Sequence, residues 1–311
     1  MASWRVDEST SIDGSSLSET AAPSGIKLWF LGARPRTLGV GITPVVVGTA
    51  AAEHATILRT LGCLLVALGL QVGVNYANDY SDGMRGVDTA ARVGPVRLVA
   101  SGLKSPRSVA IAAGIAFAVA CLAGVALARV AGWHLIGLGV LALAAAVLYS
   151  GGPKPYASAG LGELSVFLFF GLAATAGTTY VQSGAVRAQA WWSAVSMGLL
   201  AVAVLVANNL RDIPTDTAVG KRTLAVRIGD QATRALYRTV VITALVLPFV
   251  GWLVGQMPVG ALLALAAIPL AAGPLRTVGY ARGPELVRVL LGTVLMLVQF
   301  GVFLAIGLWL S

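Results

Sequence analysis

A dense run of amide and carboxylate side chains follows one of the long apolar stretches of this sequence. It reads N-Y-A-N-D-Y-S-D-G-M-R-G-V-D over residues 75–88. On a helix, Asn78 and Asp82 would lie four residues apart on one face. Carboxylates near a membrane face repel one another unless a cation lies between them. A solvated helix end is the alternative interpretation, but such an end does not need so many Asn and Asp residues.

A second oxygen-rich run closes another apolar stretch later in the chain. It reads N-N-L-R-D-I-P-T-D over residues 208–216, and Asp212 and Asp216 are again four apart. Oxygen ligands select hard cations such as Mg²⁺, which often join protein carboxylates to substrate phosphates. Two helices that each present such a pair could hold two Mg²⁺ ions across a cavity, with a diphosphate completing the coordination. The two runs together predict a metal-assisted diphosphate site.

Basic side chains follow both runs, and their geometry suits phosphate. They are Arg92, Arg97 and Lys104 after the first run, and Lys221, Arg222 and Arg227 after the second. The alternative is that each is an ordinary positive charge of a cytoplasmic loop. Because the order of acids, glycine and basic residues occurs twice, we favour a phosphate-binding role for the set.

Four further residues carry candidate chemistry. The segment Y-S-G-G-P-K-P-Y places Tyr149 and Lys154 where they could reach a diphosphate or an aromatic substrate, and Glu163 begins the next apolar stretch. A simple turn is the alternative for this segment. Arg34 lies just before or within the first apolar stretch, where an arginine is either functional or extends to the lipid headgroups.

Composition indicates that these residues belong to a helical membrane protein. The 311 residues are 57% hydrophobic and only 11% charged, and the mean hydropathy is +0.83. Several apolar runs are about 20 residues long, the length that spans a bilayer as a helix. Cys63 and Cys121 lie inside such runs, so we interpret them as small buried hydrophobes. The net charge of +9 then reflects membrane topology and an anionic ligand, and no nucleic-acid partner is expected.

The apolar runs predict nine transmembrane helices in one domain over residues 26–311. Residues 1–25 are polar and rich in serine, which is typical of a disordered cytoplasmic tail. The expected spans lie near residues 28–52, 57–79, 107–128, 133–150, 161–182, 189–210, 235–255, 258–275 and 285–310. The first of them starts near either residue 28 or residue 37.

Charge distribution predicts the orientation of these spans. With the N-terminus in the cytoplasm and the C-terminus outside, 19 of the 22 Lys and Arg residues lie on the inner side, as the positive-inside rule requires. Outside the tail, eight of the nine acids also lie there, and only Glu53 does not. The inner loops after the second and sixth spans are long, and loops of that length are usually functional. We therefore expect a cytoplasm-facing active site, capped by these two loops.

A metal, a diphosphate and a cavity that holds a lipid tail together indicate transfer of an allylic lipid group. The diphosphate would be the leaving group of an allylic lipid, and Mg²⁺ with the basic side chains would stabilise the charge that develops. Apolar helices would hold the lipid tail and exclude water from the carbocation. These residue types do not identify the acceptor that attacks it.

Four motifs of the sequence resemble those of the UbiA superfamily of intramembrane prenyltransferases. They are A-R-P-R-T-L near the first span, the run at 78–88, Y-S-G-G-P-K-P-Y, and N-N-L-R-D-I-P-T-D with the later G-K-R-T-L-A-V-R-I-G. The resemblance extends from about Trp29 to the C-terminus. It implies nine helices around a central cavity, with a cytosolic cap.

The resemblance also implies roles for individual residues. The Mg²⁺ ligands would be Asn78, Asp82, Asp212 and Asp216, with Asp88 beside them. The diphosphate would contact Lys154, Arg211, Lys221 and Arg222. From the residues alone, Arg97 is a further diphosphate candidate, and Arg34 is a candidate for contact with the diphosphate or the acceptor. Asp79, Glu163 and Tyr149 would be the candidate catalytic residues.

The branch that it resembles most prenylates 1,4-dihydroxy-2-naphthoate in the bacterial plasma membrane. The implied reaction joins a polyprenyl diphosphate to that acceptor, loses CO₂ and diphosphate, and gives a demethylmenaquinol. Another acceptor, such as 4-hydroxybenzoate or a haem vinyl group, stays open within the superfamily. A secondary transporter is the remote alternative, although its charges would lie near the midplane. A CDP-alcohol phosphotransferase would need a different spacing of its Asp residues.

Overall fold

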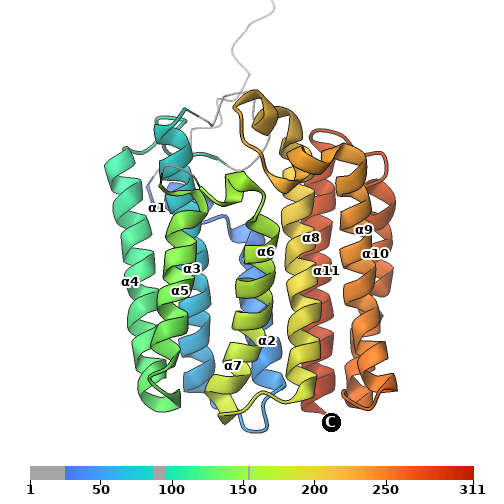
Figure 1. The fold of residues 1–311 in the computed structure, drawn as a ribbon. Coiled ribbons are helices and arrows are strands. Elements are labelled where there is room, and N and C mark those ends of the chain that lie inside the picture. Colours follow the sequence, from blue (N-terminus) through green and yellow to red (C-terminus); the bar gives the residue numbers. More distant parts are fainter. Residues whose placement is uncertain (1–24, 87–95, 153–154) are drawn as a thin grey trace, which may run out of the picture.

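A bundle of roughly parallel helices forms the fold (Figure 1). The computed structural model describes residues 25–86, 96–152 and 155–311, and no strand occurs among them. The tail, Asp88, Arg92 and Lys154 therefore lie outside the described residues. The first described helix, α1 (Ile26–Gly32), and the C-terminus lie at opposite ends of the bundle.

Seven helical segments of the described chain are long and apolar enough to cross a membrane. They are α3 (Ile57–Met84), α4 (Pro106–Ala131), α6 (Gly162–Val166) continued by η3 (Phe167–Ala173) and α7 (Ala174–Ser183), α8 (Ala188–Ala218), α9 (Leu224–Leu253), η4 (Val259–Ala267) continued by α10 (Ile268–Thr277), and α11 (Glu285–Trp309). Two shorter apolar helices, α2 (Gly39–Ala50) and α5 (Leu135–Ser150), occupy two further expected spans. The all-helical membrane fold is confirmed, while the count of nine crossings stays a prediction.

Local sequence signals mark where several helices begin. Ser105 accepts a hydrogen bond from the backbone N–H of Ser108, and Pro106 follows it as the first residue of α4, which is a favoured start. Thr223 caps α9 through the N–H of Val226. This helix starts about ten residues earlier than the expected span, and it is broken at Gly229, whose φ is +80°.

Small residues allow the helices to approach closely, as is usual in lipid. A Cβ added at Gly171 of η3 would overlap the Cα of Gly198 on α8, and Gly260 and Gly307 meet in the same way between η4 and α11. The most enclosed helix is α8: 72% of its most apolar 18-residue stretch is buried inside the protein, against 22% of the corresponding stretch of α3. The core therefore forms around α8, and α3 has one face free to line a cavity.

Candidate functional site

Residues 75–84 of the first oxygen-rich run and the whole of the second lie inside helices, and at the same height in the bundle. Asp82 is 25 residues after the first residue of α3, and Asp212 is 24 residues after the first residue of α8. At 1.5 Å per residue, both lie about 36–38 Å along their helices. Both residues are buried, with exposed fractions of 6% and 3%. Two buried carboxylates are therefore presented at one end of the bundle.

An ion pair connects the two runs. The Nζ of Lys221 donates to Oδ2 of Asp82 at 3.1 Å. Lys221 is held there because its backbone N–H donates to the carbonyl of Asp216, at 2.9 Å. The segment after α8 thus folds back over the end of α3, and a cation lies between the two acidic runs.

Arg211 neutralises the second run from within the same helix. Its Nε and Nη2 donate to the two oxygens of Asp212 at 2.7 and 2.9 Å, and Nη2 also donates to Oδ1 of Asn208 at 2.9 Å. The predicted diphosphate role of Arg211 stays untested, since in this state its guanidinium binds its own neighbours. A bidentate pair of this kind is a strong charge-assisted contact.

The first run divides into two faces of α3. Asn78 and Asp82 line the cavity, and the Oδ1 of Asn78 accepts a hydrogen bond from Ser150 at the end of α5. Asp79 points elsewhere and accepts hydrogen bonds from the backbone N–H groups of Leu98 and Val99 at 2.8 and 3.0 Å. This geometry favours a role for Asp79 in holding the segment before α4, because both of its oxygens are already engaged.

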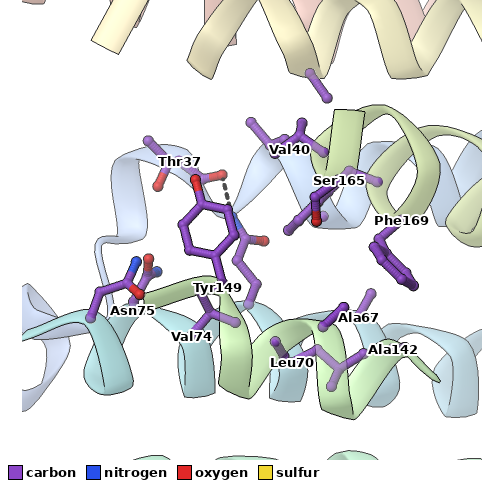
Figure 2. Close-up of a pocket in the computed structure, with 18 of the residues that line it drawn as sticks. Thr37, Val40, Ala67, Leu70, Val74, Asn75, Ala142, Tyr149, Ser165 and Phe169 are labelled. Carbon is purple, nitrogen blue, oxygen red and sulfur yellow. Dashed lines mark hydrogen bonds between the residues drawn. The ribbon is translucent and has the colours of Figure 1, made fainter. Parts of the chain in front are cut away.

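A cavity of about 970 Å³ begins at these charges and continues between the helices. Its polar end includes Asn78, Asp82, Asp212, Asp216 and Lys221, and Arg34 and Arg97 also line it. Its walls are largely apolar, including Val40, Ala67, Leu70, Val74, Ala142 and Phe169 (Figure 2). A charged end that opens into an apolar chamber suits a lipid with an anionic head.

Tyr149 projects into this cavity from α5 (Figure 2). Its ring packs edge-on against that of Tyr156, with 5.6 Å between centroids and 87° between planes. The hydroxyl of Tyr156 contacts the carbonyl of Ala145 and the hydroxyl of Ser165, each at 2.8 Å. Burial raises the pKa of Tyr156 above its ordinary value, so the phenol is protonated at neutral pH. The ring of Tyr156, held by these two contacts, packs against Tyr149 and positions it.

Two other predicted residues lie outside the cavity lining. Arg222 is exposed, and its backbone N–H donates to the carbonyl of Ser158. Glu163 is buried at the start of α6, where its Oε1 accepts a hydrogen bond from Nδ2 of Asn209 at 2.9 Å. Asn209 itself lines the cavity, which favours an orienting role for Glu163.

Sequence reasoning placed Asn209 in the second oxygen-rich run, but it assigned no role to two other cavity-lining amides, Gln71 and Asn75. On α3, Gln71 is four residues before Asn75, Asn75 is three before Asn78, and Asn78 is four before Asp82. That is the repeat of one helix face, so the spacing could have identified them.

The acidic side chains of the described residues do not form a ring around one ion. Within residues 25–86, 96–152 and 155–311, no three His, Cys, Asp or Glu side chains converge closely enough to hold a metal. Mg²⁺ usually needs only one or two protein carboxylates, because waters and substrate phosphates supply the rest. The paired amides and carboxylates of α3 and α8 therefore fit a metal that is shared with a diphosphate.

Fold and site define a class: a multi-pass helical membrane protein with a charged site at one end of an apolar cavity. Residues 41–283 match the UbiA prenyltransferase family, and the chain belongs to this family of enzymes. It is 49% identical over 280 residues to "1,4-dihydroxy-2-naphthoate octaprenyltransferase" of Mycobacterium tuberculosis, covering 89% of this chain and 95% of the relative. It is 46% identical to the protein of the same name from Mycobacterium leprae, over 91% and 96% of the two chains.

A solved structure shares the fold. It is a UbiA homologue from Archaeoglobus fulgidus bound to GPP and Mg²⁺, with a TM-score of 0.63 and 16% identity, covering 89% of this chain and 99% of that one. At this identity the likeness concerns the arrangement of the helices.

Proposed function

We propose that this prenyltransferase joins a polyprenyl diphosphate to 1,4-dihydroxy-2-naphthoate, with loss of CO₂ and diphosphate, to give a demethylmenaquinol for menaquinone synthesis. The names of the two mycobacterial relatives support the acceptor. The observation that carries the reaction is the cavity, since Asp82, Asp212 and Lys221 lie at its polar end and apolar side chains form its walls.

The polar end would hold the diphosphate with two Mg²⁺ ions. Asn78 and Asp82 on α3, and Asp212 and Asp216 on α8, are the proposed ligands, because all four line the cavity. The fold neighbour bound to GPP and Mg²⁺ supports the choice of metal. Bound Mg²⁺ supplies neutralisation of the charge that develops on the leaving diphosphate. Lys221 donates to a diphosphate oxygen in the same step, because its ammonium already lies between the two runs.

The apolar walls would hold the prenyl tail and keep water away from the allylic carbon. Among the three predicted catalytic residues, Tyr149 is the one that lines the cavity. The electron-rich face of a tyrosine ring attracts a nearby cation, so Tyr149 would stabilise the allylic carbocation and orient the acceptor beside it. Asp79 and Glu163 would act indirectly, through the segment before α4 and through Asn209.

The charged end would face the cytoplasm, with the N-terminus inside and the C-terminus outside. Three observations support this orientation: the inner-side excess of Lys and Arg residues, the shared location of the acids, and the opposite locations of α1 and the C-terminus (Figure 1).

A reconstituted assay tests the proposal. The purified protein is given a polyprenyl diphosphate and 1,4-dihydroxy-2-naphthoate, with and without Mg²⁺, and the prenylated, decarboxylated product is measured. Asp82→Ala and Asp212→Ala should abolish turnover while the protein stays folded, and Lys27→Met, which changes an exposed residue of α1, should not. Near-normal activity in both Ala variants would refute the two-helix metal site.

Acceptor competition distinguishes the alternatives. Product from 4-hydroxybenzoate but none from 1,4-dihydroxy-2-naphthoate would keep the diphosphate site and replace the acceptor. No turnover with any acceptor would favour the transporter interpretation instead.

A further inference from the structure

Gln71 lies on the face of α3 that lines the cavity. It is seven residues before Asn78, so it lies about 10 Å further along the helix, away from the charged end. Its side chain is buried, with an exposed fraction of 7%, and it lines the cavity among mostly apolar neighbours. A buried amide at this depth needs hydrogen-bond partners for both of its ends.

One end of this amide has a partner and fixes the orientation of the group. The Nε2 of Gln71 donates to the backbone carbonyl of Thr37 at 2.9 Å, drawn as the dashed line at Thr37 in Figure 2. A carbonyl needs a donor, so the amide nitrogen must face Thr37 and the oxygen must point away. The Oε1 then lies against Gly41 of α2, where a Cβ would overlap it.

The other end of the amide has no partner within the described chain. The Oε1 of Gln71 is buried, and no described residue donates a hydrogen bond to it. Leaving a desolvated acceptor without a donor is costly. A prenyl chain cannot relieve that cost, because it is hydrocarbon, and the diphosphate offers only acceptors. A phenolic acceptor substrate, in contrast, carries O–H donors.

The neighbouring turn supplies the complementary charge for such a substrate. The Nδ2 of Asn75 donates to the carbonyl of Ala33 at 3.0 Å, so α3 holds the turn at both ends, at Ala33 and Thr37. Between them, Arg34 has a left-handed backbone (φ 57°, ψ 61°) and its side chain lines the cavity. Strained backbone of this kind gathers at functional sites. The guanidinium of Arg34 on this turn and the amide of Gln71 on α3 line the same cavity, and together they suit a hydroxylated aromatic carboxylate.

We propose that the Oε1 of Gln71 accepts a hydrogen bond from the 4-hydroxyl group of the aromatic acceptor, which makes Gln71 a specificity-determining residue. The 4-hydroxyl is the free donor, since the 1-hydroxyl lies next to the carboxylate and donates to it internally. The inference rests on the proposed function for the identity of the acceptor.

A binding comparison tests the proposal without requiring turnover. Dissociation constants are measured for 1,4-dihydroxy-2-naphthoate and for 1-hydroxy-2-naphthoate, which lacks the 4-hydroxyl, on the full chain in detergent with Mg²⁺ and a non-reactive prenyl thiolodiphosphate. One buried hydrogen bond corresponds to roughly a tenfold change in affinity. The wild type should therefore bind the 1-hydroxy compound about tenfold more weakly, and in Gln71→Met the ratio should fall to near one.

Two further variants separate the hydrogen bond from general loosening. Gly41→Ala keeps the amide but displaces its oxygen, so it should also bring the ratio to near one. Gln189→Met removes a similar contact, from Nε2 to the carbonyl of Ala51 at 3.0 Å, outside the cavity lining, so its ratio should stay at the wild-type value. General loosening would weaken both ligands equally and leave the ratio unchanged.

The outcomes keep the inference distinct from the proposed function. A wild type that binds both naphthoates with a ratio near one would overturn the role of Gln71 alone. So would a tenfold ratio that persists in Gln71→Met. A wild type that binds neither naphthoate would overturn the inference and the proposed acceptor together.

Discussion

Lys221 occupies the position beside Asp82 where the proposed function requires a metal ion. Its ammonium is 3.1 Å from the carboxylate, and the two side chains are only 17% and 9% exposed. If Asp82 binds Mg²⁺ as proposed, the lysine would compete with the metal for this carboxylate until a diphosphate draws the ammonium away. Replacing Lys221 with Met keeps the length of the side chain but removes its charge, so metal binding and turnover should change in opposite directions.

The geometry sets the size of both effects. A hydrogen bond to a charged group contributes about 1.5–3 kcal/mol, and little is lost to screening because the pair is mostly buried. At about 1.4 kcal/mol per tenfold, Lys221→Met should bind Mg²⁺ alone roughly 10- to 100-fold more tightly than the wild type. Its KM for polyprenyl diphosphate should rise by a similar factor, because the same ammonium is lost from the diphosphate complex.

Calorimetric Mg²⁺ titration without substrate and steady-state assays with it measure the two quantities. Lys27→Met is the matched control, since it removes an exposed lysine from α1 and should change neither. Weaker Mg²⁺ binding in Lys221→Met would refute the competition. An unchanged KM would show that the lysine does not contact the diphosphate.

Three other changes follow from contacts within the bundle. Glu163→Gln keeps an oxygen that can accept from Asn209, so its turnover should stay within about tenfold of the wild type, whereas Glu163→Leu should lose more activity. Complete loss of turnover in the Gln variant would make Glu163 the catalytic base. Gly171→Ala forces a methyl group against the backbone of Gly198 and should destabilise the protein by about 1–3 kcal/mol in thermal unfolding, whereas Gly137→Ala meets no neighbour within 4 Å and should not. Cys63→Ala should keep its activity, as expected of a buried small hydrophobe; inactivity in a folded variant would assign the thiol a role.

Features that depend on a single stretch of chain were predictable from the sequence. The lengths of the apolar runs locate the long helices, and the four-residue spacing of Asn78 and Asp82 places both on one cavity-lining face. The expected end of the second span, near residue 79, was too early, because α3 continues to Met84. Polar residues at a membrane surface are compatible with a helix, so the apolar run ends before the helix does.

Contacts between distant segments could not be predicted in the same way. The sequence predicts the same diphosphate-binding role for the adjacent cations Lys221 and Arg222. In the structure, Lys221 forms an ion pair with Asp82, whereas Arg222 is exposed. Asp79 resembles Asp82 in sequence, but the segment at Leu98 and Val99 engages it. Which side of a chain faces the cavity is decided by these tertiary contacts.

The common height of the two acidic runs has a consequence for how a lipid substrate would move. Both carboxylates lie about 36–38 Å along their helices, while the hydrocarbon core of a bilayer is about 30 Å thick. If both helices begin at the opposite surface of the membrane, the proposed diphosphate site would lie at the level of the lipid headgroups, with the cavity extending below it into the hydrocarbon layer. A polyprenyl diphosphate would enter without changing its depth in the membrane, so its charged head would not have to cross an apolar layer before the reaction.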